Sequence, residues 1–194
     1  MTMRKFLVPT IITCGIFLFL SPIFAHLTDN LHPIVLFVVF ICILAATVSV
    51  YLFVMNLSLT IPRRVFYGCF FLYTIALLIL LFIRPNEQSM EYFNLMPFDT
   101  IIFYLSGKVH WVIAFYNLAA NIGLFIPFGI LLRQRTVNKL ILTILPFLLV
   151  SAIEITQYLT RRGSLDIDDL ILNVFGFYIG YGLYPWFQKV IIVR

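Results

Sequence analysis

Six apolar runs, each close to 20 residues long, divide this 194-residue chain. A helix of about 20 residues crosses the roughly 30 Å hydrocarbon layer of a bilayer at about 1.5 Å per residue. Only 11% of the residues are charged, against about 25% in soluble domains, so a water-soluble domain is excluded. The sequence predicts an all-α, polytopic membrane helix bundle with transmembrane helices near residues 6–25, 34–55, 65–83, 112–132, 140–158 and 169–187.

The first apolar run has two interpretations. Arg4 and Lys5 precede it and Ala25 closes it before a polar segment, as in a secretory signal peptide. The run is longer than most signal cores of about 7–15 residues, and Ile23 fits an Ala-x-Ala cleavage site poorly. We therefore expect a retained helix, and cleavage stays open as the alternative.

The basic residues predict the orientation of the bundle. With the N-terminus in the cytoplasm, nine of the 13 Lys and Arg residues fall on the cytoplasmic side, and all eight acidic residues fall in outer loops or outer helix ends. An excess of Lys and Arg in cytoplasmic loops is the usual signature of topology. The sequence thus predicts a multi-pass membrane protein with both termini in the cytoplasm. The net charge of +5 therefore gives no reason to expect a nucleic-acid partner.

The loop between the third and fourth apolar runs contains a short helix signal. Pro97 suits a first helical position and Asp99 the first turn. Three apolar residues, Ile101, Ile102 and Leu105, share one face with the preceding phenylalanine. This pattern predicts a short interfacial helix lying at the outer membrane surface.

Two polar stripes flank a tight turn near the end of the chain. Glu154, Gln157 and Arg161 are spaced i, i+3 and i+7, so they share one helix face. Asp166 and Asp169 have the spacing of an N-cap and an N3 residue, and Asn173 continues their face. Lipid cannot satisfy such groups, so they must face protein, water or a ligand.

Polar residues of other segments belong to the same predicted leaflet. Asn117 and Asn121 share a face of the fourth apolar run, and Arg84 ends the third. We expect these groups to converge on one site. The candidate ligand-binding residues are Arg84, Asn94, Asn117, Asn121, Glu154, Gln157, Arg162, Asp166, Asp169 and Asn173. Asp168 points away from the face of its neighbours, and we expect it to be solvated.

The chemistry of this cluster stays open from sequence alone. A carboxylate at Glu154, inside a span, requires a cation or a proton, which makes Glu154 the candidate catalytic residue if the site is an enzyme. Asp166 and Asp169 weakly resemble an oxygen-rich metal site, although acidic residues also occur at helix starts for capping. The sequence identifies no cofactor.

The last apolar run carries Gly176 and Gly180 four residues apart. Such small-residue pairs allow close helix contact. The contact can lie within the chain, or it can serve a second copy or another membrane partner.

Taken together, these motifs resemble the VanZ-like family of membrane proteins. The resemblance covers about residues 84–181 in the family's order. The matching elements are NLMPFDTI at 94–101, Asn117, Asn121, FIPFG at 125–129, Glu154, Gln157, RGSLDIDD at 162–169, Asn173, Gly176 and Gly180. The family commonly has a second glycine where this chain has Phe177, which implies somewhat altered helix packing.

The resemblance implies two parts and a broad role. Residues 65–194 are expected to form the VanZ-like four-helix membrane domain, and residues 1–64 to add two N-terminal transmembrane helices. The family implies a bacterial cell-membrane protein linked to tolerance of glycopeptides such as teicoplanin.

Three kinds of function remain possible for the polar cluster. The first is a binding protein for a membrane-lipid headgroup, a lipid-linked cell-wall precursor or an amphiphilic antibiotic. The second is an enzyme acting on a lipid-linked substrate by acid/base or metal chemistry. The third is a structural subunit in which the polar groups only hold helices together.

Overall fold

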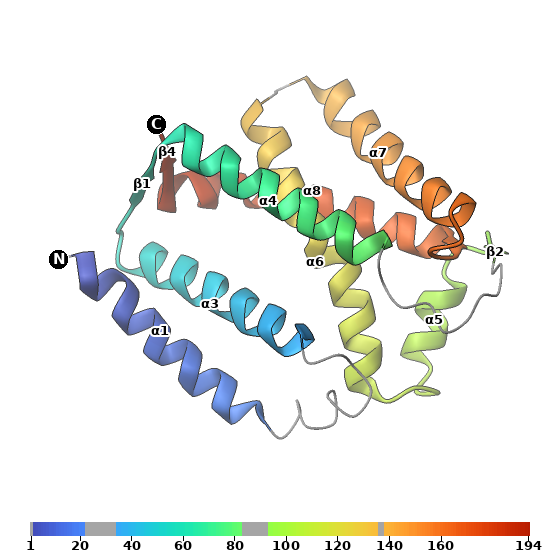
Figure 1. Ribbon diagram of the computed structural model, residues 1–194, viewed down its shortest axis with the longest axis horizontal. Coiled ribbons are helices and arrows are strands. Elements are labelled where there is room, and N and C mark those ends of the chain that lie inside the picture. Colours follow the sequence, from blue (N-terminus) through green and yellow to red (C-terminus); the bar gives the residue numbers. More distant parts are fainter. Residues whose placement is uncertain (1, 22–33, 83–92, 136–137) are drawn as a thin grey trace. The chain divides into compact units, whose positions relative to one another are not determined.

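The computed structural model describes residues 2–21, 34–82, 93–135 and 138–194, and these residues are mostly helical (Figure 1). The helices are α1 (Thr2–Phe19), α3 (Ile34–Val54), α4 (Arg63–Phe82), α5 (Asp99–Leu105), α6 (Trp111–Arg135), α7 (Lys139–Leu159) and α8 (Ile167–Val190). The short strands are β1 (Leu59–Ile61), β2 (Phe93–Asn94), β3 (Leu165–Asp166) and β4 (Ile191–Val193). The chain divides into two compact units, one of Met1–Ile61 with Trp186–Arg194 and the other of Pro62–Pro185.

The first unit is built on a helix pair and a short strand pair. Helices α1 and α3 run alongside each other (Figure 1), and Thr13 of α1 hydrogen-bonds to Thr47 of α3. Strands β1 and β4 pair in parallel, with Leu59 opposite Ile191. The predicted domain boundary at residue 64 stays a prediction.

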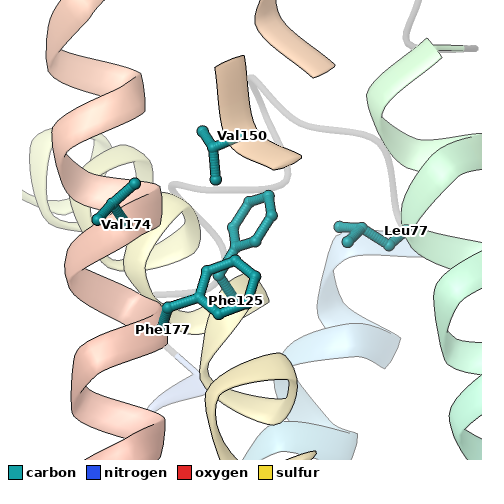
Figure 2. Packing of buried hydrophobic residues seen from close by; sticks show 5 residues of the cluster. All are labelled: Leu77, Phe125, Val150, Val174 and Phe177. Atoms are coloured by element: carbon teal, nitrogen blue, oxygen red, sulfur yellow. The ribbon is translucent and has the colours of Figure 1, made fainter. Parts of the chain in front are cut away.

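The second unit has an apolar core to which four helices contribute. Leu77 of α4, Phe125 of α6, Val150 of α7, and Val174 and Phe177 of α8 form one buried cluster (Figure 2). The rings of Phe125 and Phe177 lie 5.6 Å apart, a favourable distance for an aromatic pair. Phe177 is therefore a core residue of this bundle, which explains why a large side chain is accommodated beside Gly176.

Helices α6 and α8 are close enough for their backbones to touch. A Cβ at Gly176 would overlap the carbonyl oxygen of Ile122, and one at Gly180 would overlap that of Ile126. From the other side, a Cβ at Gly129 would overlap the carbonyl oxygen of Phe177. The two glycines thus allow a close helix contact within the chain, which is one of the two alternatives predicted from the sequence. A partner could reach the same surface only by displacing α6.

Four of the described helices are long and apolar enough to cross a membrane, within Arg63–Phe82, Ile113–Arg135, Lys139–Leu159 and Ile167–Val190. They correspond to the third to sixth predicted spans. In the described parts of α1 and α3, the apolar stretches are the shorter segments Leu7–Phe19 and Ile43–Val54. The mostly helical membrane class is confirmed, whereas the total of six spans and the interfacial position of the short helix stay predictions.

Candidate functional site

Strands β2 and β3 bring together the segments NLMPFDTI at 94–101 and RGSLDIDD at 162–169. They pair in parallel, with Asn94 opposite Asp166. Thr100 of α5 donates a hydrogen bond to Asp166 Oδ2 at 2.6 Å and accepts one from Asn94 Nδ2 at 3.2 Å. The second oxygen of Asp166 accepts from the backbone N–H of Asp168 at 2.9 Å, which is the bond of a helix N-cap residue. The predicted cap is therefore present, and Asn94 and Asp166 both hold α5 to the start of α8.

Asp168 occupies a different environment from the one predicted. It is completely buried, and its carboxylate accepts hydrogen bonds from the backbone N–H groups of Phe98 at 2.6 Å and Ile101 at 3.1 Å. Phe98 precedes α5 with a left-handed φ of 69° and caps it with no side-chain hydrogen bond of its own. Asp168 supplies that cap from α8. The expectation of a solvated side chain is wrong, because the first backbone amides of α5 are brought onto it by the β2–β3 pairing.

The hydrogen bonds that join Asn94, Thr100 and Asp166 are called the clasp below. Replacing Thr100 by valine tests it. Valine keeps the shape but removes the hydroxyl that links Asn94 to Asp166, so a buried carboxylate oxygen and a buried amide lose their partner. We expect a loss of about 1–3 kcal/mol in unfolding free energy, measured by thermal unfolding in detergent. Thr156→Val, on an exposed part of α7, is the matched control and should change stability little. Equal stability of the two variants would contradict the clasp.

Asn121 and Asp169 connect α6 to α8 next to this clasp. Asn121 Nδ2 donates to Asp169 Oδ1. Both side chains are half-buried. The carboxylate of Asp169 therefore turns towards α6. In a capping box, by contrast, the N3 side chain turns back to the N-cap residue of its own helix.

Glu154 and Asn173 form the most deeply buried polar pair of the candidate residues. Each is only 4% exposed, and Asn173 Nδ2 donates to Glu154 Oε1 at 3.4 Å. The other two oxygens of the pair, Glu154 Oε2 and Asn173 Oδ1, are buried with no hydrogen-bond partner. A buried polar atom without a partner costs about 1–3 kcal/mol. Asp169 and Asp166 are the acidic groups near enough to act electrostatically on Glu154.

The remaining candidates are more widely distributed. Gln157 Nε2 donates to the Leu81 carbonyl at 3.0 Å and so links α7 to the end of α4. Asn117 Nδ2 donates to the Ile113 carbonyl of its own helix at 2.9 Å. Arg162 is exposed in the turn after α7. Arg84 lies outside the described residues. The structure thus brings together Asn94, Asp166, Asn121, Asp169, Glu154 and Asn173, while Asn117 bonds locally.

Asp166 and Asp169, the weak metal candidates, both accept hydrogen bonds from protein donors. No group of three or more His, Cys, Asp or Glu side chains in the described part of the chain is arranged to hold a metal ion. Both oxygens of Asp166 already accept hydrogen bonds from protein donors. Asp166 therefore acts as a cap and a tether.

Sequence reasoning missed two residues of this cluster, Asp168 and Thr100. The pattern of acidic residues at 166, 168 and 169 draws attention to the segment, but spacing along one helix says nothing about amides near residue 100. Thr100 lies in a short, mostly apolar helix, where a threonine hydroxyl is a weak signal. Both residues act across the β2–β3 junction, which only the fold brings together.

Comparisons with known proteins match the part of the chain that contains the polar cluster. The model of the VanZ/LLP1 family matches residues 70–188, which include every residue of the cluster described above. Protein VanZ of Enterococcus faecium is 29% identical over 121 residues, covering 61% of this chain and 71% of that protein. No solved structure matches the chain. The family match extends over more than half of the chain, and the protein belongs to the VanZ/LLP1 family.

Proposed function

We propose that this protein binds the polar part of a membrane amphiphile and thereby contributes to glycopeptide tolerance. The ligand classes are a membrane-lipid headgroup, a lipid-linked cell-wall precursor and an amphiphilic antibiotic of the teicoplanin type. Membership of the VanZ/LLP1 family and the similarity to Protein VanZ support the broad role. The ligand would be recognised at the polar cluster of α6, α7 and α8.

The carrying observation is the buried Glu154–Asn173 pair. Glu154 Oε2 and Asn173 Oδ1 lie buried and take no hydrogen bond from any third residue of the described chain. Polar groups inside a membrane domain cost free energy, and they commonly mark a substrate or ion site. These two buried polar atoms suit a ligand group that can form hydrogen bonds, such as a sugar hydroxyl or a peptide amide.

The finer architecture of the proposal follows the positive-inside pattern. Six spans with both termini in the cytoplasm would put the polar cluster in the outer leaflet of the cell membrane. There Arg162, and Arg84 from outside the described residues, would meet phosphate or carboxylate of the ligand. A binding protein placed in that leaflet could change how much antibiotic or precursor is available at the cell surface.

The surface of α5 supports an interfacial position for this helix. Phe98, Ile102 and Leu105 are 55%, 62% and 70% exposed, and Lys108 follows them with its ammonium 5.9 Å from the Phe103 ring centroid. Large apolar side chains with a nearby basic residue suit the boundary between headgroups and acyl chains. α5 would then lie at the level from which an amphiphile enters the cluster.

Native mass spectrometry of the purified protein tests the binding function. We expect wild type to retain a polar lipid or precursor, and Asn173→Leu to lose at least about tenfold of that adduct, because leucine removes both hydrogen-bonding atoms while keeping the volume. Thr143→Ala, exposed nearer the other end of α7, should retain it. Equal adducts in all three proteins would contradict binding at this site.

A susceptibility assay tests the link to glycopeptides. Wild type expressed in a susceptible host is expected to raise the minimal inhibitory concentration of teicoplanin several-fold, and Asn173→Leu to abolish that increase at equal amounts of membrane protein. An increase that survives the substitution would separate tolerance from the polar cluster.

A further inference from the structure

With Glu154 ionised, the Glu154–Asn173 pair forms one hydrogen bond and lacks the proton needed for a second. Both side chains end in a planar group with two polar atoms. Asn173 Nδ2 donates to Glu154 Oε1 at 3.4 Å, and the remaining atom of each group, Oε2 and Oδ1, is an unpartnered acceptor when Glu154 is ionised. Two acceptors cannot bond to each other, whereas a carboxylic acid can donate.

We infer that Glu154 is a neutral carboxylic acid whose Oε2–H donates to Asn173 Oδ1. The two side chains then form a closed acid–amide pair with two antiparallel hydrogen bonds. A single proton satisfies both buried oxygens at once, and it removes an uncompensated charge from a membrane-spanning helix.

The neighbouring acidic groups explain why the proton belongs to Glu154. The titratable groups that face it are Asp169 of α8 and Asp166 of β3. Asp166 accepts bonds from Thr100 and from the Asp168 amide, and Asp169 accepts one from Asn121 of α6. Glu154 keeps one oxygen buried with no hydrogen-bond partner, and the backbone N–H of Asp166 also faces its carboxyl group.

The pair also restricts the ligand chemistry, a consequence that rests on the proposed function. A ligand that reaches Oε2 and Oδ1 must open the pair, accept a hydrogen bond from the Oε2–H group and donate one to Asn173 Oδ1. A hydroxyl or an amide group can do both, whereas an ionised phosphate oxygen can only accept.

Infrared spectroscopy of the purified, ligand-free protein tests for the proton directly. We expect wild type at neutral pH to show a carboxylic-acid C=O band that shifts in D₂O and disappears in Glu154→Gln. The band should remain in Asp99→Asn, which changes an exposed acid of α5. A wild-type spectrum without the band would overturn the inference.

Variant stability provides a second, independent readout. Glutamine at 154 can donate from Nε2 and accept at Oε1, so Glu154→Gln should unfold within a few degrees of wild type while Glu154→Ala unfolds much earlier. The exchanged double variant Glu154→Gln/Asn173→Asp should recover most of the stability lost in Asn173→Asp alone. If Gln is as damaging as Ala, an ionised Glu154 is required and the inference is wrong.

These measurements separate the inference from the proposed function. The band and the unfolding temperatures need no ligand, so they can support the acid–amide pair even if no amphiphile is retained. Loss of the lipid adduct in Asn173→Leu without any carboxylic-acid band would support binding and refute the pair.

Discussion

Replacing Gly176 by alanine is expected to prevent α6 and α8 from packing in their native position. The added methyl would overlap the carbonyl oxygen of Ile122, and it would lie only 3.0 Å from the carbonyl carbon. Backbone cannot rotate away as a side chain can, so the helices must separate and the core around Phe125 and Phe177 must loosen. Overpacking lowers the free energy of unfolding by about 1–3 kcal/mol, occasionally more. Because the added methyl meets backbone atoms, we expect a loss at the upper end of this range.

The measurement is the fraction of protein that elutes as a single species in detergent after heating. Gly180→Ala should behave like Gly176→Ala, because its methyl would meet the Ile126 carbonyl. Gly182→Ala and Gly123→Ala are matched controls on the same two helices, since nothing lies within 4 Å of a Cβ at either position. Wild-type heat resistance in Gly176→Ala would contradict the close approach of α6 to α8.

Replacing Asp168 by asparagine is expected to release α5 from the start of α8. The carboxylate accepts two backbone hydrogen bonds, whereas asparagine keeps one acceptor and turns an N–H group towards a backbone N–H. Hydrogen bonds to charged groups contribute about 1.5–3 kcal/mol each, so the loss should be on the order of 2–4 kcal/mol. Because the damage is local, much of it should appear as opening of residues 98–105 rather than as global unfolding.

Hydrogen exchange measured by mass spectrometry distinguishes the local effect. Amides of α5 should exchange at least about tenfold faster in Asp168→Asn, while those of α7 stay protected. Asp99→Asn is the control, because Asp99 is an exposed acid of the same short helix. Unchanged exchange in α5 of Asp168→Asn would mean that another contact holds this helix.

Loss of the α5 tether also bears on the proposed binding site. The same β2–β3 junction holds Asp166 and Asn94, and the first two turns of α8 carry Asp169 and Asn173. If α5 is the entry level for an amphiphile, Asp168→Asn should reduce adduct retention, although the Asp168 carboxylate bonds to the backbone amides of Phe98 and Ile101. Asp168 is in this sense a positioning residue.

Helical structure and the membrane class were predictable from sequence because both depend on local properties. Apolar runs of about 20 residues with few charges require backbone hydrogen bonds to be made within the segment, and a helix does this. The four candidate spans follow the predicted runs within a few residues. The short helix after Pro97 was predictable for the same reason, since its start signals lie next to one another.

Most residues of the candidate site could be predicted from the sequence, but their hydrogen-bond partners could be predicted only in part. Glu154 and Asn173 were expected to face a polar environment, since lipid cannot satisfy them. That they pair with each other depends on the angle and distance at which α7 and α8 meet. Asn117 was also predicted to belong to the site from its position on the helix face, but its side chain donates to the Ile113 carbonyl of its own helix.

The sequence by itself determined where the helices run and which of their faces are polar, because periodicity along a helix is set by covalent spacing. Only the tertiary structure decided that Asp168 is a buried cap for α5 and that α6 fills the glycine surface of α8. Those contacts join segments that are far apart in the chain, and their formation depends on which backbones can approach each other without a side chain between them.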